Sequence, residues 1–169
     1  MAKWCFRMSV LIVLALALLA CNNTGVGSYS FIDQNLQGKI GGVSWTWEGT
    51  EDGGLAEEGF GGNLTVEIRD ITAVGGDPCA FGAFSATDYE VFFKVPKAPV
   101  DAVGLYELGF ETGQYVTLYD GVTNYICAEG AVEILSVSAT SGGLVTGRMD
   151  VTADENSTVN GNFTVTYCP

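Results

Sequence analysis

Residues 158–168 read Thr-Val-Asn-Gly-Asn-Phe-Thr-Val-Thr-Tyr-Cys, a stretch in which apolar or small side chains alternate with polar ones. Successive side chains of a β-strand point to opposite faces. Val159, Gly161, Phe163, Val165 and Tyr167 would therefore share one face, and the polar residues between them the other. This alternation predicts a long strand with one face in the core and the other in water.

The same pattern continues upstream in short stretches divided by Gly, Asp, Asn and Pro. Strands are predicted at 39–47, 63–71, 89–95, 104–108, 115–119, 123–127, 131–139, 144–152 and 158–168. Asp120-Gly121, Gly142-Gly143 and Asn160-Gly161 supply or tolerate the positive φ of turns and bulges. We expect an all-β fold, an antiparallel β-sandwich or an up-and-down β-barrel of about 8–10 strands. The last three strands should form a meander.

The first twenty residues have the layout of a signal peptide. Lys3 and Arg7 form a basic start without acids, and an uncharged, mostly apolar run follows to Ala20. The strongly apolar part is about a dozen residues, shorter than the roughly 20 that a membrane-spanning helix needs. A signal helix in residues 1–20 is predicted, and a permanent transmembrane helix is the weaker interpretation.

The apolar run ends in Leu18-Leu19-Ala20-Cys21, which resembles the lipobox of bacterial lipoproteins. The resemblance implies cleavage after Ala20, diacylglycerol on the Cys21 thiol and commonly a third acyl chain on the new amino group. Two or three acyl chains anchor a protein almost permanently. The lipid bilayer is thus an expected partner, and the alternative is an ordinary secretory signal with Cys21 as a plain thiol. Because Asn22 is not Asp, the outer membrane of a Gram-negative cell is favoured.

Beyond Cys21 the sequence divides into two parts. Residues 22–37 are rich in Asn, Gly, Ser and Gln, so residues 21–37 are expected to be a lipidated cysteine and a flexible tether. Residues 38–169 are expected to form one β domain.

Several segments together resemble a broad group of uncharacterised bacterial envelope lipoproteins. They are the lipobox, the opening stretch 38–47, Asp77-Pro78-Cys79, and the closing stretches 130–134, 145–149 and 159–169. The resemblance implies a secreted all-β domain and assigns no activity, cofactor or catalytic residue.

Charge and composition exclude several functions. Without residues 1–20, five basic residues face twenty acidic ones, a net charge of −15. Nucleic acid and anionic surfaces are poor partners for such a field. Histidine is absent, which excludes Ser-His-Asp triads, Cys-His pairs and His-ligated metals. No cofactor and no metal are expected.

Three cysteines, Cys79, Cys127 and Cys168, remain after the signal peptide and Cys21 are set aside. An oxidising envelope permits one disulfide among them. A three-strand meander would separate Cys127 from Cys168 by some 25 to 30 Å, beyond a Cα separation of usually under ~7 Å. Cys79 is therefore the common partner. An up-and-down order favours Cys79 with Cys127, and a Greek-key crossover would instead allow Cys79 with Cys168.

Two features could bind a ligand. Trp45 and Trp47 share a strand face and could form an aromatic platform for a sugar or an apolar ligand, although a core role is favoured. Acidic residues gather at 48–62, with Glu51, Asp52, Glu57 and Glu58, and before the last strand, with Asp150, Asp154 and Glu155. Neither cluster has calcium-loop spacing, so solvated loops are favoured.

The sequence therefore predicts a membrane-anchored lipoprotein that is a binding or structural module of the cell envelope and not an enzyme. A variant of this prediction is a barrel that carries a lipid-like ligand. The competing hypothesis is a carboxylate-based glycan hydrolase, which requires two acids about 5 to 10 Å apart in one cleft.

Overall fold

The computed structural model describes residues 29–48, 53–69, 78–79 and 89–169. The predicted signal helix, Cys21, Glu51 and Asp52 lie outside these residues. The described chain is all-β, as predicted. No helix among the described residues is long and apolar enough to cross a membrane.

The described residues form eleven strands and one 3₁₀ turn. The strands are β1 (Gln37–Ile40), β2 (Val43–Thr46), β3 (Gly54–Gly59), β4 (Asn63–Arg69), β5 (Glu90–Val95), β6 (Gly104–Glu107), β7 (Val116–Tyr119), β8 (Asn124–Cys127), β9 (Glu129–Val137), β10 (Leu144–Asp154) and β11 (Ser157–Cys168). The 3₁₀ turn η2 (Pro99–Asp101) links β5 to β6.

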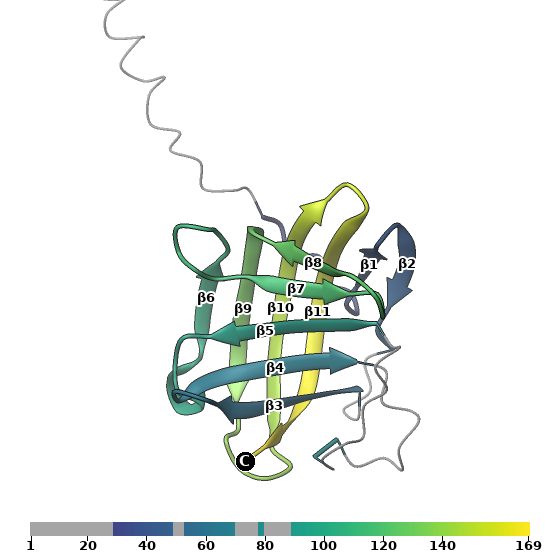
Figure 1. Ribbon diagram of the computed structural model, residues 1–169. Coiled ribbons are helices and arrows are strands. Elements are labelled where there is room, and N and C mark those ends of the chain that lie inside the picture. Colours follow the sequence, from purple (N-terminus) through teal and green to yellow (C-terminus); the bar gives the residue numbers. More distant parts are fainter. Residues whose placement is uncertain (1–28, 49–52, 70–77, 80–88) are drawn as a thin grey trace, which may run out of the picture.

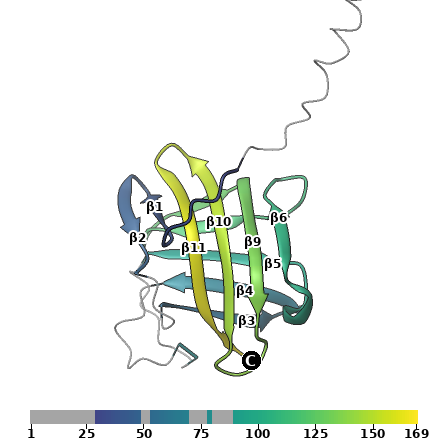
Figure 2. The same ribbon diagram turned by 180° about the vertical axis from the view of Figure 1, so that it is seen from behind.

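All eleven strands belong to one curled sheet, in which nine follow the order β6-β9-β10-β11-β3-β4-β5-β7-β8 and the β1–β2 hairpin branches from β11 through β1. Figure 1 shows β3, β4, β5 and β7 crossing in front of β6, β9, β10 and β11, and Figure 2 shows the second group from its outer side. Strands β9, β10 and β11 form the predicted antiparallel meander. The sheet departs from up-and-down order at two places: β11 pairs in parallel with β3, and β6 pairs with β9 while β5 pairs with β7.

The core lies between the two crossing groups of strands. Leu64, Val66 and Ile68 of β4 are fully buried, as their alternation predicted. Phe93 of β5 meets Phe163 of β11 edge to face, with ring centroids 5.7 Å apart. Because these rings come from the two groups, they join the two crossing groups of strands across the core.

Two strand predictions were wrong. Residues 39–47 form a hairpin, β1 and β2, instead of one strand, because Gly41 and Gly42 adopt φ values of 60° and 82° and reverse the chain. Residues 48–62 were expected to be a loop, yet β3 lies within them and places Glu57 and Glu58 on a strand. Residues 54–59 form a strand because they pair with β4, although their acidic, glycine-rich sequence did not predict one.

The segment before β1 lies on the sheet. The Leu36 amide donates to the Asn162 carbonyl oxygen at 3.0 Å, and the Asn162 amide donates to the Gln34 carbonyl oxygen at 2.8 Å. Gly161 allows this approach, because a Cβ there would lie 2.7 Å from the Asn35 carbonyl oxygen. Residues 34–36, within the stretch predicted to be a flexible tether, therefore lie against β11.

The disulfide joins Cys79 to Cys168, with Cα atoms 5.4 Å apart. The favoured pairing of Cys79 with Cys127 was wrong, because it assumed an up-and-down order. Strand β11 instead runs beside β3, the neighbour of β4, so that its end reaches the connection between β4 and β5 where Cys79 lies. The free thiol is therefore the buried Cys127, whereas the favoured pairing would have left Cys168 free.

Candidate functional site

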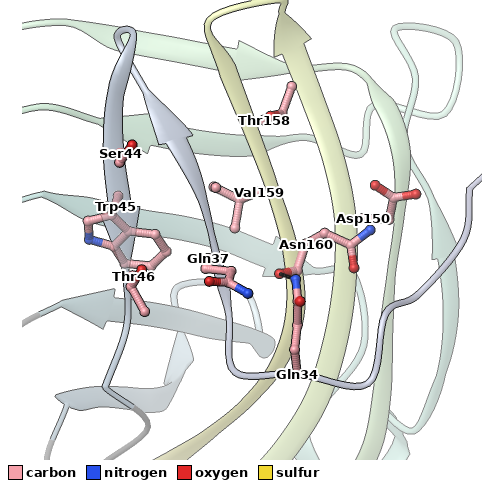
Figure 3. Close-up of a pocket in the computed structure, with 10 residues that line it drawn as sticks. Gln34, Gln37, Ser44, Trp45, Thr46, Asp150, Thr158, Val159 and Asn160 are labelled. Carbon is pink, nitrogen blue, oxygen red and sulfur yellow. Dashed lines mark hydrogen bonds between the residues drawn. The ribbon is translucent and has the colours of Figure 1, made fainter.

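A polar groove of about 400 Å³ lies between the β1–β2 hairpin and the outer side of β10 and β11. Figure 3 shows the Trp45 indole turned toward Gln37, with Asn160 and Asp150 beyond it on the β10–β11 side. The groove is lined by Gln34, Gln37, Gly38, Ser44, Trp45, Thr46, Asp150, Thr158, Val159 and Asn160. Amide and hydroxyl groups therefore dominate its surface.

The floor of the groove depends on close packing of β1 against β11. Gly38 pairs with Val159 on one side and with Trp45 on the other. A Cβ at Gly38 would overlap the Thr158 carbonyl oxygen, so a glycine is needed for β1 to approach β11 this closely. This contact sets the distance between the hairpin and the β10–β11 side of the groove.

The two tryptophans do not form a shared exposed platform. Trp47 is buried, and its indole N–H donates to the Gly53 carbonyl oxygen at 3.1 Å. Trp45 is also part of the core, but it keeps 9% of its surface exposed and contributes to the wall of the groove. The favoured core interpretation is therefore confirmed, and Trp45 offers a ligand only an edge of its ring.

On the opposite wall, hydrogen bonds to residues 29–36 orient Asn160 and Asp150. The Asn160 Oδ1 accepts from the Ile32 amide and its Nδ2 donates to the Ser30 carbonyl oxygen, each at 2.9 Å. The Asp150 Oδ2 accepts from the Ser30 amide at 2.7 Å. The Gln34 Nε2 donates to the Asn160 carbonyl oxygen at 3.3 Å. These bonds hold the wall in one arrangement.

The groove contains one carboxylate, Asp150, and no basic side chain. The acids Asp154 and Glu155 lie at the turn between β10 and β11, and neither lines the groove. Among the described residues, no group of three or more acids or cysteines is arranged to hold a metal ion. The groove is thus suited to hydrogen bonding and not to binding an anion.

Comparison of the chain with protein-family models, curated proteins and solved structures found no match.

Paired carboxylates do occur elsewhere, on the outer side of β4 and β5. Arg69 forms ion pairs with Glu67 at 2.5 Å and with Glu90 at 2.9 Å. Burial raises the pKa of the Glu90 carboxyl above its ordinary value, although the Arg69 charge opposes the shift. Both carboxylates are held by the guanidinium, and neither lines the groove or a second pocket of about 340 Å³ beside β6.

The sequence singled out Trp45 as a possible ligand contact but gave no prediction of the groove or of its polar residues. Gln34 and Gln37 belong to the segment predicted to be a tether, and Asn160 was expected only to face water. The available signal was the Asn-Gly-Asn sequence at 160–162, which interrupts an otherwise apolar and Thr-rich strand.

Proposed function

We propose that this chain is a lipid-anchored binding module of a bacterial envelope, and that its groove binds a neutral, polyhydroxylated ligand such as a sugar unit of an envelope glycan. The observation that carries the proposal is the groove lining, in which three side-chain amides and three hydroxyls surround the edge of Trp45. Amides and hydroxyls both donate and accept, as the hydroxyls of a sugar do.

The charge of the chain supports a neutral ligand. The chain carries 20 acidic and 7 basic residues, and two of the basic residues belong to the predicted signal peptide. Because the groove has no Lys or Arg and contains Asp150, an anionic ligand would meet repulsion without a compensating ion pair. A neutral glycan incurs no such cost.

The hydrolase hypothesis receives less support from the same geometry. Glycoside hydrolysis usually needs two carboxyl groups across one cleft. The groove has only Asp150, and the pocket beside β6 has only Glu107. Binding without turnover is therefore the proposal that fits these two pockets.

The anchor can be tested on cells grown with an alkyne fatty acid. Wild-type protein should take up the label and stay with the membrane fraction, because acylated Cys21 holds it there. Cys21→Ser should lose both the label and membrane retention. A labelled or membrane-bound Cys21→Ser protein would contradict the anchor and leave the groove proposal standing.

The groove can be tested by calorimetric titration with the neutral N-acetylglucosamine trisaccharide and with maltotriose. At least one should bind, and an anionic trigalacturonate should not. Gln37→Ala and Ser44→Ala should each weaken binding roughly two- to tenfold, which corresponds to the loss of one hydrogen bond.

The matched control is Asn124→Ala, an exposed polar residue on β8 that does not line the groove. Its affinity should equal that of the wild type. Binding of neither neutral sugar, or equal affinities in all three variants, would refute the proposed site.

A further inference from the structure

Residues 29–36, hereafter the docked segment, cross the outer side of β10 and β11 before the chain turns into β1. Figure 2 shows this segment as the dark trace lying over β10 and β11. It joins the predicted lipid anchor to the β domain. Its last residue, Leu36, is fully buried in the core.

Polar contacts hold most of the docked segment in place. Ser30, Ile32, Asp33 and Asn35 are exposed, and half of the Ile32 surface remains in water. Phe31 is half-buried, and the Arg148 guanidinium lies 4.5 Å from its ring centroid. Leu36 fixes the end of the segment in the core, whereas residues 29–35 bury so little apolar surface that they can detach while Leu36 and the core stay folded.

The residues that hold the docked segment also line the groove. The Asn160 side-chain amide donates to the Ser30 carbonyl oxygen and accepts from the Ile32 amide, and the Asp150 carboxylate accepts from the Ser30 amide. Gln34, within the segment, contributes a side chain to the groove wall. Gln37 on the facing hairpin follows directly after the segment.

We infer that the groove is completed by the docked segment, with Asn160 and Asp150 as positioning residues, so that ligand binding and docking stabilise each other. Detachment removes Gln34 from the wall and releases the side chains of Asn160 and Asp150. A ligand that contacts this wall binds the docked state better, and by linkage it must favour docking by the same factor.

Through this coupling, ligand binding in the groove would change how firmly the chain next to the lipid anchor is docked, because the docked segment connects the groove to the anchor. The inference rests on the proposed function for its ligand. The state of the segment itself can be measured independently of any ligand, as exchange of its backbone amides.

The experiment uses full-length lipidated protein in nanodiscs and follows hydrogen exchange of the peptide that covers residues 29–36. In the wild type, a saturating concentration of whichever trisaccharide binds, the N-acetylglucosamine trisaccharide or maltotriose, should slow exchange of this peptide. Asn160→Ala should speed exchange without ligand and weaken the trisaccharide about tenfold, as expected for two lost hydrogen bonds. Asp150→Asn, which keeps an acceptor, should stay within about threefold of the wild type.

The matched control is Thr164→Ala, on the same strand and the same face as Asn160 but outside the groove and the segment contacts. It should change neither exchange nor affinity. Trisaccharide binding with unchanged exchange at residues 29–36, or an Asn160→Ala protein with wild-type affinity, overturns the coupling alone. If neither the N-acetylglucosamine trisaccharide nor maltotriose binds the wild type, the proposed ligand class of the groove is wrong, and the coupling to it is wrong as well.

Discussion

The Cys127 thiol is enclosed by the core at the end of β8, with none of its surface exposed. Burial raises its pKa to about 12, and the negative charge of Asp154 adds to the shift. A cysteine reacts through its thiolate. At pH 8 only about one thiol in ten thousand would be ionised at such a pKa, so Cys127 is expected to be chemically inert.

We therefore predict that folded protein does not react with iodoacetamide at Cys127 between pH 7 and pH 9. The raised pKa keeps the thiol protonated throughout this range, because ionisation becomes appreciable only as the pH approaches 12. Mass spectrometry should find Cys127 alkylated after guanidinium unfolding without reductant, while the disulfide protects Cys79 and Cys168. Native-state alkylation at the rate of an exposed cysteine would contradict this burial.

At the scale of elements, the meander depends on a glycine opposite an aromatic ring. Gly147 of β10 pairs with Phe163 of β11, and a Cβ at Gly147 would overlap the Phe163 ring and lie 2.6 Å from the Glu133 carbonyl oxygen. The missing side chain thus makes room for the ring that joins the two layers through Phe93.

Gly147→Ala should therefore lower the free energy of unfolding by about 1 to 3 kcal/mol, the usual cost of overpacking a core. Urea unfolding followed by tryptophan fluorescence measures this change. Gly109→Ala is the matched control, because its Cβ would meet nothing closer than the Thr112 Oγ1 at 3.5 Å. It should change stability by less than about 0.5 kcal/mol, and an equal loss in both variants would argue against the steric cause.

Local patterns predicted the elements that carry their own signal. Alternation identified β4 and β11, because each strand has one fully buried face. It failed for the β1–β2 hairpin, because the alternation runs on through Gly41-Gly42, and these two adjacent glycines form a turn. It also missed β3, since only Leu55 and Ala56 are apolar at its centre and pairing with its neighbours decides its structure.

At the scale of the whole molecule, the groove and the disulfide depend on contacts between distant parts of the chain. The docked segment is held by side chains some 120 residues away, such as Asp150 at Ser30, and polar contacts of this kind leave no periodicity in a sequence. The disulfide was assigned by strand parity, which the parallel pairing of β11 with β3 breaks. Sequence reasoning could name Cys79 and Cys168 as candidates but not choose the pair.

The same long-range connection sets a prediction for stability. The Cys79–Cys168 bond spans a sequence separation of 89 residues. Such a bond restricts the unfolded chain, and the chain-entropy relation gives about 4 to 5 kcal/mol for a loop of this length. The oxidised protein should therefore be more stable than the reduced protein by up to this amount, as measured by urea unfolding with and without dithiothreitol. Cys79→Ser/Cys168→Ser should match the reduced wild type in both conditions, whereas Cys127→Ala should keep the full difference. If dithiothreitol destabilised the double variant as well, the cross-link would lie elsewhere.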